Sequence, residues 1–174
     1  MKFQMMPLLA ANEQRFKQDM QEAFQLGAGI KCGELEREIL PERDIDQSLN
    51  AAGAMAWQAM EDGVLVGGAI TVVRKEKGEL AFLYVKHNCQ GRKIGQKIWQ
   101  FIEAQYPAVK VWETCTPYFE KSNIHFYINC CGFAAVEFYN PHHSLPESSA
   151  QDNDEHGPGE EYFFRFKKVI GNGG

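Results

Sequence analysis

The sequence predicts a mixed α/β (α+β) domain with one central sheet. Its 174 residues suffice for one domain that buries about two-thirds of its unfolded surface. A hydrophobic fraction of 44% and a charged fraction of 24% are ordinary for a globular protein. The local patterns run strand, two helices, three strands, helix, strand, helix and two strands. This order predicts about seven strands flanked by about four helices.

The first twelve residues, MKFQMMPLLAAN, predict a strand. They superficially resemble a signal peptide, but Gln4 and Pro7 interrupt an apolar run that is too short for a secretory core. No segment approaches the roughly 18 apolar residues of a membrane span. We therefore expect a first strand, no membrane association, and a cytoplasmic protein.

Two helices are expected next. Asn12 can cap the first, which ends at the glycines of residues 27–29. Pro41 suits the first turn of the second, shorter helix. The apolar side chains at helical spacing are Phe16, Met20 and Phe24 in the first helix, and Ile45 and Leu49 in the second.

Three strands then follow. Residues 54–60 and 64–73 read as strands around a tight Asp62-Gly63 hairpin turn. Lys77-Gly78 predicts another turn, and residues 80–85 form an apolar strand after it.

The second half of the chain predicts two helices and three strands. Gly132 can end the second helix in a left-handed conformation, and Pro107 ends the first. In order, the expected elements are a helix with the stripe Ile94, Ile98, Phe101 and Ile102, a strand over 109–114, a helix from Ser122 or Asn123 through Cys131, a strand over 133–139, a polar loop over 141–160, a strand over 162–168 and a frayed tail over 171–174.

Charge and cysteine content exclude several classes of protein. The net charge of −5 argues against a nucleic-acid-binding protein, which needs a basic face. The odd number of cysteines, without Cys-x-x-Cys spacing or paired histidines nearby, argues against a disulfide framework and a zinc site. We therefore expect reduced thiols and no metal. The five cysteines are Cys32, Cys89, Cys115, Cys130 and Cys131.

The segment NCQGRKIGQKIW, residues 88–99, leaves the end of a predicted strand and opens an amphipathic helix. The first amides of such a helix lack internal partners and attract anions. Gly91 and Gly95 would let a phosphate approach the backbone, and charge-assisted bonds would come from Arg92, Lys93 and Lys97. The alternative is a lysine-rich helix start with no ligand. The Gly-Lys-Ser/Thr and Gly-x-Gly-x-x-Gly patterns of other phosphate-binding loops are absent.

The patterns Gln90-x-x-Lys93-x-Gly95 and SNIHFYINCCGF resemble two motifs of the GCN5-related N-acetyltransferase (GNAT) family. Gln90-x-x-Lys93-x-Gly95, preceded by LYV at the end of a strand, resembles the family's motif A, usually written Gln/Arg-x-x-Gly-x-Gly/Ala. Lys93 departs from it, because a glycine is usual there. SNIHFYINCCGF, residues 122–133, is similar to motif B, and the order of strands and helices is also the family's order.

The resemblance implies a single N-acetyltransferase domain over residues 1–174, with a mixed, mostly antiparallel sheet. It implies an enzyme that moves an acetyl group from acetyl-coenzyme A directly to a primary amine. The cofactor would lie between splayed strands near 80–85 and 109–114. The implied cofactor-binding residues are Leu83, Tyr84, Val85, Gln90, Gly91, Arg92, Lys93, Ile94, Gly95, Gln96 and Asn123.

The resemblance also implies catalytic roles. Tyr127 would protonate the departing thiolate, and its reference pKa of about 10 means that the hydroxyl carries a proton to give at neutral pH. Glu79 or Glu113 would take the proton of the attacking amine, and a water chain without a single base is a third possibility. The alternatives are a core aromatic at position 127, a plain helix cap at Asn123 and a solvated glutamate at Glu79.

The amine acceptor is a small molecule or a peptide that the sequence does not identify. In the family, residues corresponding to 12–50 and the loop between the last two strands border the acceptor. That loop either steers a cationic amine or is simply a solvated segment. Its carboxylates are Asp152, Asp154, Glu155, Glu160 and Glu161, and its histidines, His142, His143 and His156, lack metal-ligand spacing.

Other functions remain in competition. A non-catalytic acyl-coenzyme A-binding regulatory module would keep the same cofactor cleft. A nucleic-acid binder using RKIGQK is disfavoured by the net acidity. Cys89 and Cys115 lack an evident base, which disfavours a covalent enzyme intermediate. A homodimer is compatible with the resemblance.

Overall fold

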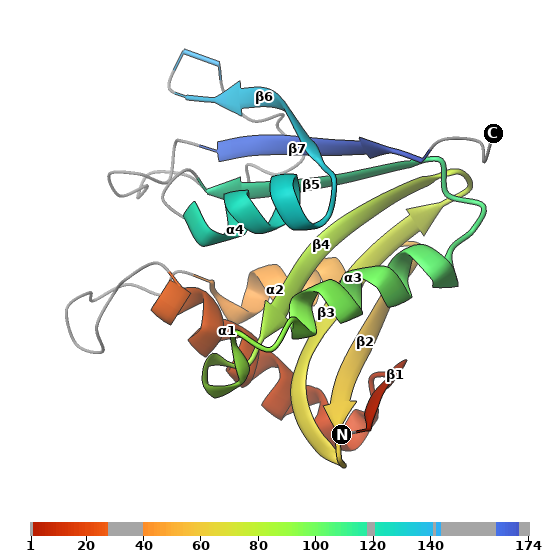
Figure 1. Ribbon diagram of the computed structural model, residues 1–174, viewed down its shortest axis with the longest axis vertical. Coiled ribbons are helices and arrows are strands. Elements are labelled where there is room, and N and C mark those ends of the chain that lie inside the picture. The colour runs from red at the N-terminus through yellow and green to blue at the C-terminus, as the bar shows by residue number, and fades with distance from the viewer. Residues whose placement is uncertain (1, 28–39, 118–120, 141, 144–162, 171–174) are drawn as a thin grey trace.

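The computed structural model describes residues 2–27, 40–117, 121–140, 142–143 and 163–170, which form a seven-stranded sheet in the order β1-β2-β3-β4-β5-β7-β6 (Figure 1). The predicted mixed sheet with flanking helices is thereby confirmed. The strands are β1 (Phe3–Pro7), β2 (Ala54–Glu61), β3 (Val64–Arg74), β4 (Lys77–Val85), β5 (Val111–Pro117), β6 (Ala134–Tyr139) and β7 (Phe163–Val169). The helices are η1 (Ala10–Asn12), α1 (Glu13–Gly27), α2 (Glu42–Leu49), η2 (His87–Cys89), α3 (Ile94–Gln105), α4 (Lys121–His125) and η3 (Phe126–Cys130).

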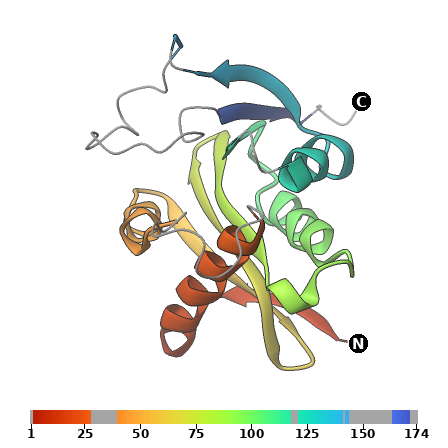
Figure 2. The ribbon, with the colours of Figure 1, turned by 90° about the vertical axis from the view of Figure 1, so that its left-hand side faces the viewer.

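The helices cover both faces of the sheet. Figure 2 shows α1 and α2 on one face and α3 and α4 on the other. Neighbouring strands run antiparallel except for β4 and β5, which are parallel. The chain needs the crossover helix α3 between these two strands, because parallel neighbours cannot be joined by a tight turn.

The two hairpin turns follow different rules. Asp62 and Gly63 both have positive φ, 51° and 81°, as the predicted Asp-Gly turn requires. The predicted Lys77-Gly78 turn is wrong, because the chain turns at Lys75 and Glu76, and Lys75 takes a φ of 56°. Gly78 instead lies inside β4, where its missing side chain makes room for the ring of Trp112.

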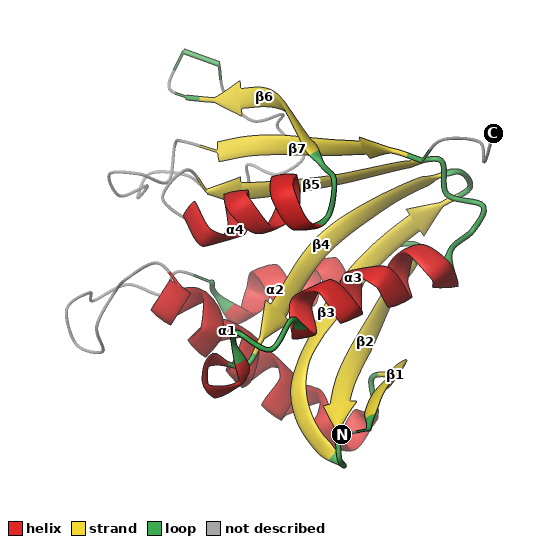
Figure 3. Ribbon diagram, in the orientation of Figure 1, coloured by secondary structure: helices red, strands yellow, loops and turns green. Residues whose placement is uncertain are grey.

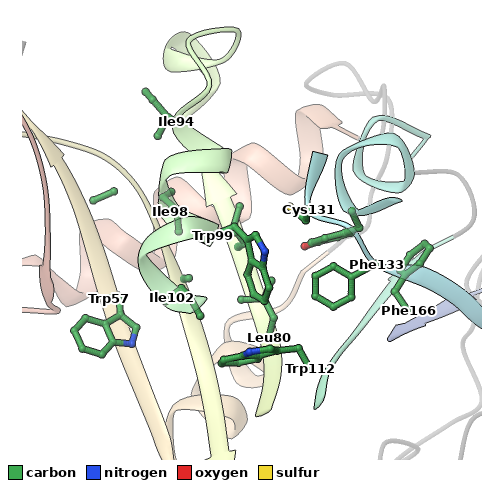
Figure 4. Close-up of a cluster of buried hydrophobic side chains, with 14 of the residues drawn as sticks. Trp57, Leu80, Ile94, Ile98, Trp99, Ile102, Trp112, Cys131, Phe133 and Phe166 are labelled. Atoms are coloured by element: carbon green, nitrogen blue, oxygen red, sulfur yellow. The ribbon is translucent and has the colours of Figure 1, made fainter. Parts of the chain in front are cut away.

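Two hydrophobic cores hold the layers together. The larger core lies between the sheet and α3, and Trp99, Trp112 and Phe133 meet there at tilted or edge-on ring angles (Figure 4). The smaller core, around Phe16 and Ile45, joins α1 and α2 to the opposite face. Side chains that alternate between the two faces along β3 and β4 therefore pack in different cores.

A β-bulge changes this alternation in the middle of β4. Thr71 pairs with Leu80 and Ile70 pairs with Phe82, so Ala81 is the extra residue. Leu80 therefore packs in the larger core. Phe82, on the other side of the bulge, packs against the smaller one.

Strands β4 and β5 pair only near the start of each strand. The paired positions are Lys77 with Val111, Gly78 with Trp112 and Glu79 with Glu113. Beyond them the strands diverge (Figures 1 and 3). At the point of divergence the buried hydroxyl of Thr114 donates a 2.8 Å hydrogen bond to the Leu80 carbonyl, in place of a strand amide.

Gly78→Ala tests this junction. A Cβ at position 78 would lie 2.6 Å from ring atoms of the fully buried Trp112, and overpacking of this kind costs about 1–3 kcal/mol of unfolding free energy. Urea denaturation should show the loss, and Trp112→Phe in the same chain should offset part of it by making room. An equal loss in both backgrounds would contradict the packing explanation.

Candidate functional site

A cavity of about 540 Å³ lies beside the end of β4, beyond its pairing with β5. The end of β4, the loop after it, the first turn of α3, the start of α4 and the last turns of α1 form its walls. Its lining residues are Ala23, Phe24, Leu83, Tyr84, Val85, Gln90, Gly91, Lys93, Ile94, Gly95, Gln96, Ser122, Asn123, His125 and Phe126. All the expected cofactor-binding residues except Arg92 are in this list.

The first turn of α3 presents backbone amides to the cavity. The first hydrogen bond of the helix runs from the Lys97 amide to the Lys93 carbonyl, 3.1 Å away. The amides of Ile94, Gly95 and Gln96 therefore have no helical acceptor, and all three residues line the cavity. The first turn of α3 contains no acidic residue. The helix dipole and these amides thus favour an anion here.

Lys93 occupies a left-handed position. Its φ and ψ are 60° and 22°, directly before α3. A residue with a side chain pays about 1 kcal/mol for this conformation, and glycine does not. The departure from the motif at Lys93 therefore affects backbone strain, and it also places a lysine at the wall of the cavity.

The other two basic side chains, Arg92 in the loop and Lys97 in α3, contact β1 and β2 and do not line the cavity. The Arg92 guanidinium lies 2.6 Å from a carboxylate oxygen of Glu61 at the end of β2. The Lys97 ammonium lies over the ring of Phe3 in β1, 5.4 Å from its centre. Of the three expected basic ligands, Lys93 lines the cavity, and Arg92 and Lys97 are directed to the β1–β2 pair.

Gly91 and Gly95 serve different purposes. Gly91 has a φ of 86°, which disfavours a side chain, and a Cβ there would meet no atom within 4 Å. Gly95 is inside α3, where a Cβ would lie 3.1 Å from the ring of Phe126. Gly91 thus allows the turn, and Gly95 allows α3 and η3 to approach each other at the wall of the cavity.

The motif from residue 122 to 133 divides between the cavity and the core. Asn123 lines the cavity, and α4 then widens into a π turn, in which the Cys131 amide donates to the Phe126 carbonyl. Tyr127 is buried, with its ring centre 5.7 Å from that of Phe133 and 5.8 Å from that of Phe166. Its ring therefore packs in the larger core, outside the cavity lining.

The two expected bases are paired across the β4–β5 junction, outside the cavity lining. Both carboxylate oxygens of Glu113 face cations, at 2.9 Å from Arg165 and 3.4 Å from Lys77. Glu79 is exposed, and among the described residues it has no ion pair within 4 Å. Of the two carboxylates, Glu79 therefore has the freer oxygens.

Cys115 lies beside these carboxylates on β5. The thiol is at the exposed surface, but partial burial of its sulfur, followed by the charge of Glu79, raises its pKa to about 11. Little thiolate is present at neutral pH, so Cys115 is a poor nucleophile.

Two polar groups are buried between α1 and β4. The Tyr84 hydroxyl and one Asp19 oxygen have no hydrogen-bond partner among the described residues. Burial is the main cause that raises the pKa of each group. The ring of Tyr84 packs edge-on against Phe16 in the smaller core.

Several cavity residues have no distinctive sequence signal. The last turns of α1 contribute Ala23 and Phe24, α4 contributes Ser122, and η3 contributes Phe126. His125 also lines the cavity, and its Nδ1 lies 2.8 Å from the Asn129 amide nitrogen. The sequence assigned no role to His125, because a histidine at this position can simply face solvent.

The acceptor side is only partly described. The carboxylates of residues 152–161 and His156 lie outside the described residues, as does Cys32. His143 is described and lies 2.7 Å from Glu137.

Within the described ranges, no group of His, Cys, Asp or Glu side chains is placed to hold a metal ion. No described helix has the length and apolar character needed to cross a bilayer.

Comparison with known proteins gives a consistent result. Residues 15–133 match the family described as Acetyltransferase (GNAT) family. The uncharacterized protein YrkN of Bacillus subtilis (strain 168) is 40% identical over 160 residues, which cover 89% of this chain and 86% of YrkN.

Solved structures share the fold. The PaiA N-acetyltransferase of Thermoplasma acidophilum, in complex with coenzyme A, has a TM-score of 0.66 at 17% identity, over 98% of this chain and 100% of that one. A GNAT family acetyltransferase from Elizabethkingia anophelis, with acetyl-CoA bound, has a TM-score of 0.67 at 13% identity, over 97% and 98% of the two chains. The ribosomal-protein-S18-alanine N-acetyltransferase of Escherichia coli has a TM-score of 0.68 at 12% identity, over 99% and 97%. With the cavity, the loop and the match over residues 15–133, the chain belongs to the GNAT acetyltransferase family.

Proposed function

We propose that this protein is an acetyl-coenzyme A-dependent N-acetyltransferase that acts on a primary amine of a small molecule or peptide. The observation that carries the proposal is the cavity beside the unpaired end of β4, lined at one end by the free amides of α3. A long donor with a phosphate at one end and a thioester at the other suits this shape. Relatives of the same fold hold coenzyme A or acetyl-CoA.

The donor would be held mainly by backbone groups. Past Leu80, whose carbonyl is bonded to Thr114, the edge of β4 that faces β5 has no strand partner, so its amides and carbonyls are available to a pantetheine arm. The pyrophosphate would lie at the amides of residues 94–96, with Lys93 beside it. Asn123, at the opposite wall, would contact the pantetheine.

The chemistry requires positioning, polarisation and two proton transfers. Acetyl-CoA supplies a thioester carbonyl carbon that a neutral amine attacks, forming the amide and releasing the thiolate. The Val85 amide, at the cavity wall, would stabilise negative charge on the carbonyl oxygen. Tyr127 would donate a proton to the leaving sulfur, and Glu79, directly or through water, would accept the amine proton. The ion pairs of Glu113 favour Glu79 in this role.

A non-catalytic acyl-coenzyme A-binding module is the second candidate, because Tyr127 packs in the core and Glu113 is held in ion pairs.

Thermal shift separates both candidates from an unrelated function: acetyl-CoA at 100 times its Kd should add about 2.7 kcal/mol to the unfolding free energy. Thiol release with polyamines, amino acids, aminoglycosides and peptide amino termini separates the enzyme from the module. Stabilisation without thiol release from any amine would favour the module, and no stabilisation would contradict both.

Lys93→Gly tests how the phosphate is held. Removing the left-handed side chain relieves about 1 kcal/mol of strain, so thermal stability should not fall. Since the amides of α3 remain, we expect acetyl-CoA affinity, measured by calorimetry, to fall by about tenfold or less. A loss above about a hundredfold would show that the lysine ammonium is the main phosphate ligand.

Tyr127→Phe tests the acid. The substitution keeps the aromatic ring in the core, so the fold should persist. If the hydroxyl protonates the thiolate, kcat should fall by about 10²-fold or more while acetyl-CoA affinity stays within about threefold. Phe126→Leu, at the cavity wall, is the matched control for a loss of packing, and it should alter affinity more than kcat. An unchanged kcat in Tyr127→Phe would overturn the assignment.

A further inference from the structure

Arg92, in the loop before α3, forms an ion pair with a buried carboxylate at the end of β2. Glu61, the last residue of β2, is only 6% exposed, and its carboxylate lies 2.6 Å from the Arg92 guanidinium. A buried carboxylate needs such a partner, because an unpaired charge in this position is strongly unfavourable. Arg92 is therefore held on the side of the loop that faces away from the cavity.

The strand around Glu61 is well fixed. Glu61 pairs with Phe3 in β1 and with Val64 in β3. The next residue, Asp62, accepts a 2.8 Å hydrogen bond from the Lys2 amide through its side chain, and its own amide donates to the Lys2 carbonyl at 2.9 Å. The carboxylate of Glu61 is thus presented from a rigid site.

The loop itself has few bonds of its own. Among the described residues, the backbone amide bonds of this region are made by Cys89, to the Lys86 carbonyl, and next by Lys97, to the Lys93 carbonyl. Between them, Gly91 and Lys93 both take positive φ, at 86° and 60°. Arg92 lies between these two residues, so its ion pair fixes the segment at its centre.

A second contact supports the same arrangement. The Lys97 ammonium lies over the ring of Phe3, the residue paired with Glu61. Two basic residues, one in the loop and one in the first turns of α3, thus contact adjacent positions on the β1–β2 edge.

We propose that Glu61 is a positioning residue for donor binding. Through Arg92 it holds residues 91–93 in the conformation that directs the α3 amides and Lys93 to the cavity, and Arg92 itself does not bind phosphate. This inference rests on the proposed acetyl-CoA site. Glu61 acts on the site from outside it, across the end of β3.

The test is a double-mutant cycle on acetyl-CoA binding, measured by calorimetry with Glu61→Gln, Arg92→Gln and the double variant. We expect each single variant to weaken binding about tenfold, and the double variant to be no weaker than the poorer single one. At saturating acetyl-CoA, kcat should stay within about twofold of the original protein, so that the effect appears in KM. Arg92→Lys, which keeps the charge but not the fork geometry, should give a smaller loss and serves if Arg92→Gln does not fold.

Two controls isolate the phosphate end of the donor. S-acetyl-pantetheine lacks the pyrophosphate, so Glu61→Gln should leave kcat/KM for this shorter donor within about twofold. Glu76→Gln breaks an ion pair, 3.1 Å to Lys110, on the exposed surface away from the loop. It should leave acetyl-CoA binding unchanged.

The outcomes separate the inference from the proposed function. If the original protein does not bind acetyl-CoA, the proposed function fails, and this inference fails with it. If it binds but Glu61→Gln binds equally well or more tightly, the inference alone is overturned, since Glu61 then does not support the loop or competes with phosphate for Arg92. A much larger loss in Arg92→Gln than in Glu61→Gln would likewise overturn it, by making Arg92 a direct phosphate ligand.

Discussion

The site depends on the short pairing of β4 with β5. Parallel strands normally continue their ladder, but here it stops after three positions, and the Thr114 hydroxyl takes over the Leu80 carbonyl. The ring of Trp112 fills the space beside Gly78, and because Trp112 also packs in the larger core, it stabilises the paired part of β4 and β5. Beyond Leu80, the residues of β4 pair with β3 on one side and have no strand partner on the other. The cavity lies beside this unpaired end of β4.

The basic side chains near the cavity contact different parts of the molecule. The loop before α3 and the first turns of α3 contain three basic side chains, Arg92, Lys93 and Lys97, and the structure directs Lys93 to the cavity and the other two to β1 and β2. Charge attraction to a phosphate would thus come chiefly from backbone amides and the helix dipole, which no substitution of a side chain removes. The strain at Lys93 and the buried position of Glu61 indicate that the loop conformation is set by the protein in advance of any ligand.

The sequence predicted the fold well because its signals are local. The Asp62-Gly63 turn, the apolar stripe of α3 and the strand pattern depend on residues close together in the chain. The turn at Lys75 was missed because Gly78 suggested a turn two residues later, whereas this glycine makes room for a tryptophan that is distant in sequence. Likewise, motif positions identified the cavity wall, but no local pattern pairs Arg92 with Glu61, 31 residues earlier. The acceptor side is harder still, because several segments that would border it lie outside the described residues.

The central claim is that a coenzyme A-type donor lies along the free edge of β4 with its pyrophosphate at the start of α3. A crystal structure of the protein with coenzyme A tests this most directly. The account predicts pyrophosphate oxygens within hydrogen-bond distance of the amides of residues 94–96, and pantetheine amide groups paired with the β4 backbone near Leu83 and Val85. Coenzyme A bound elsewhere, or a pyrophosphate held by Arg92 with its Glu61 contact broken, would contradict it.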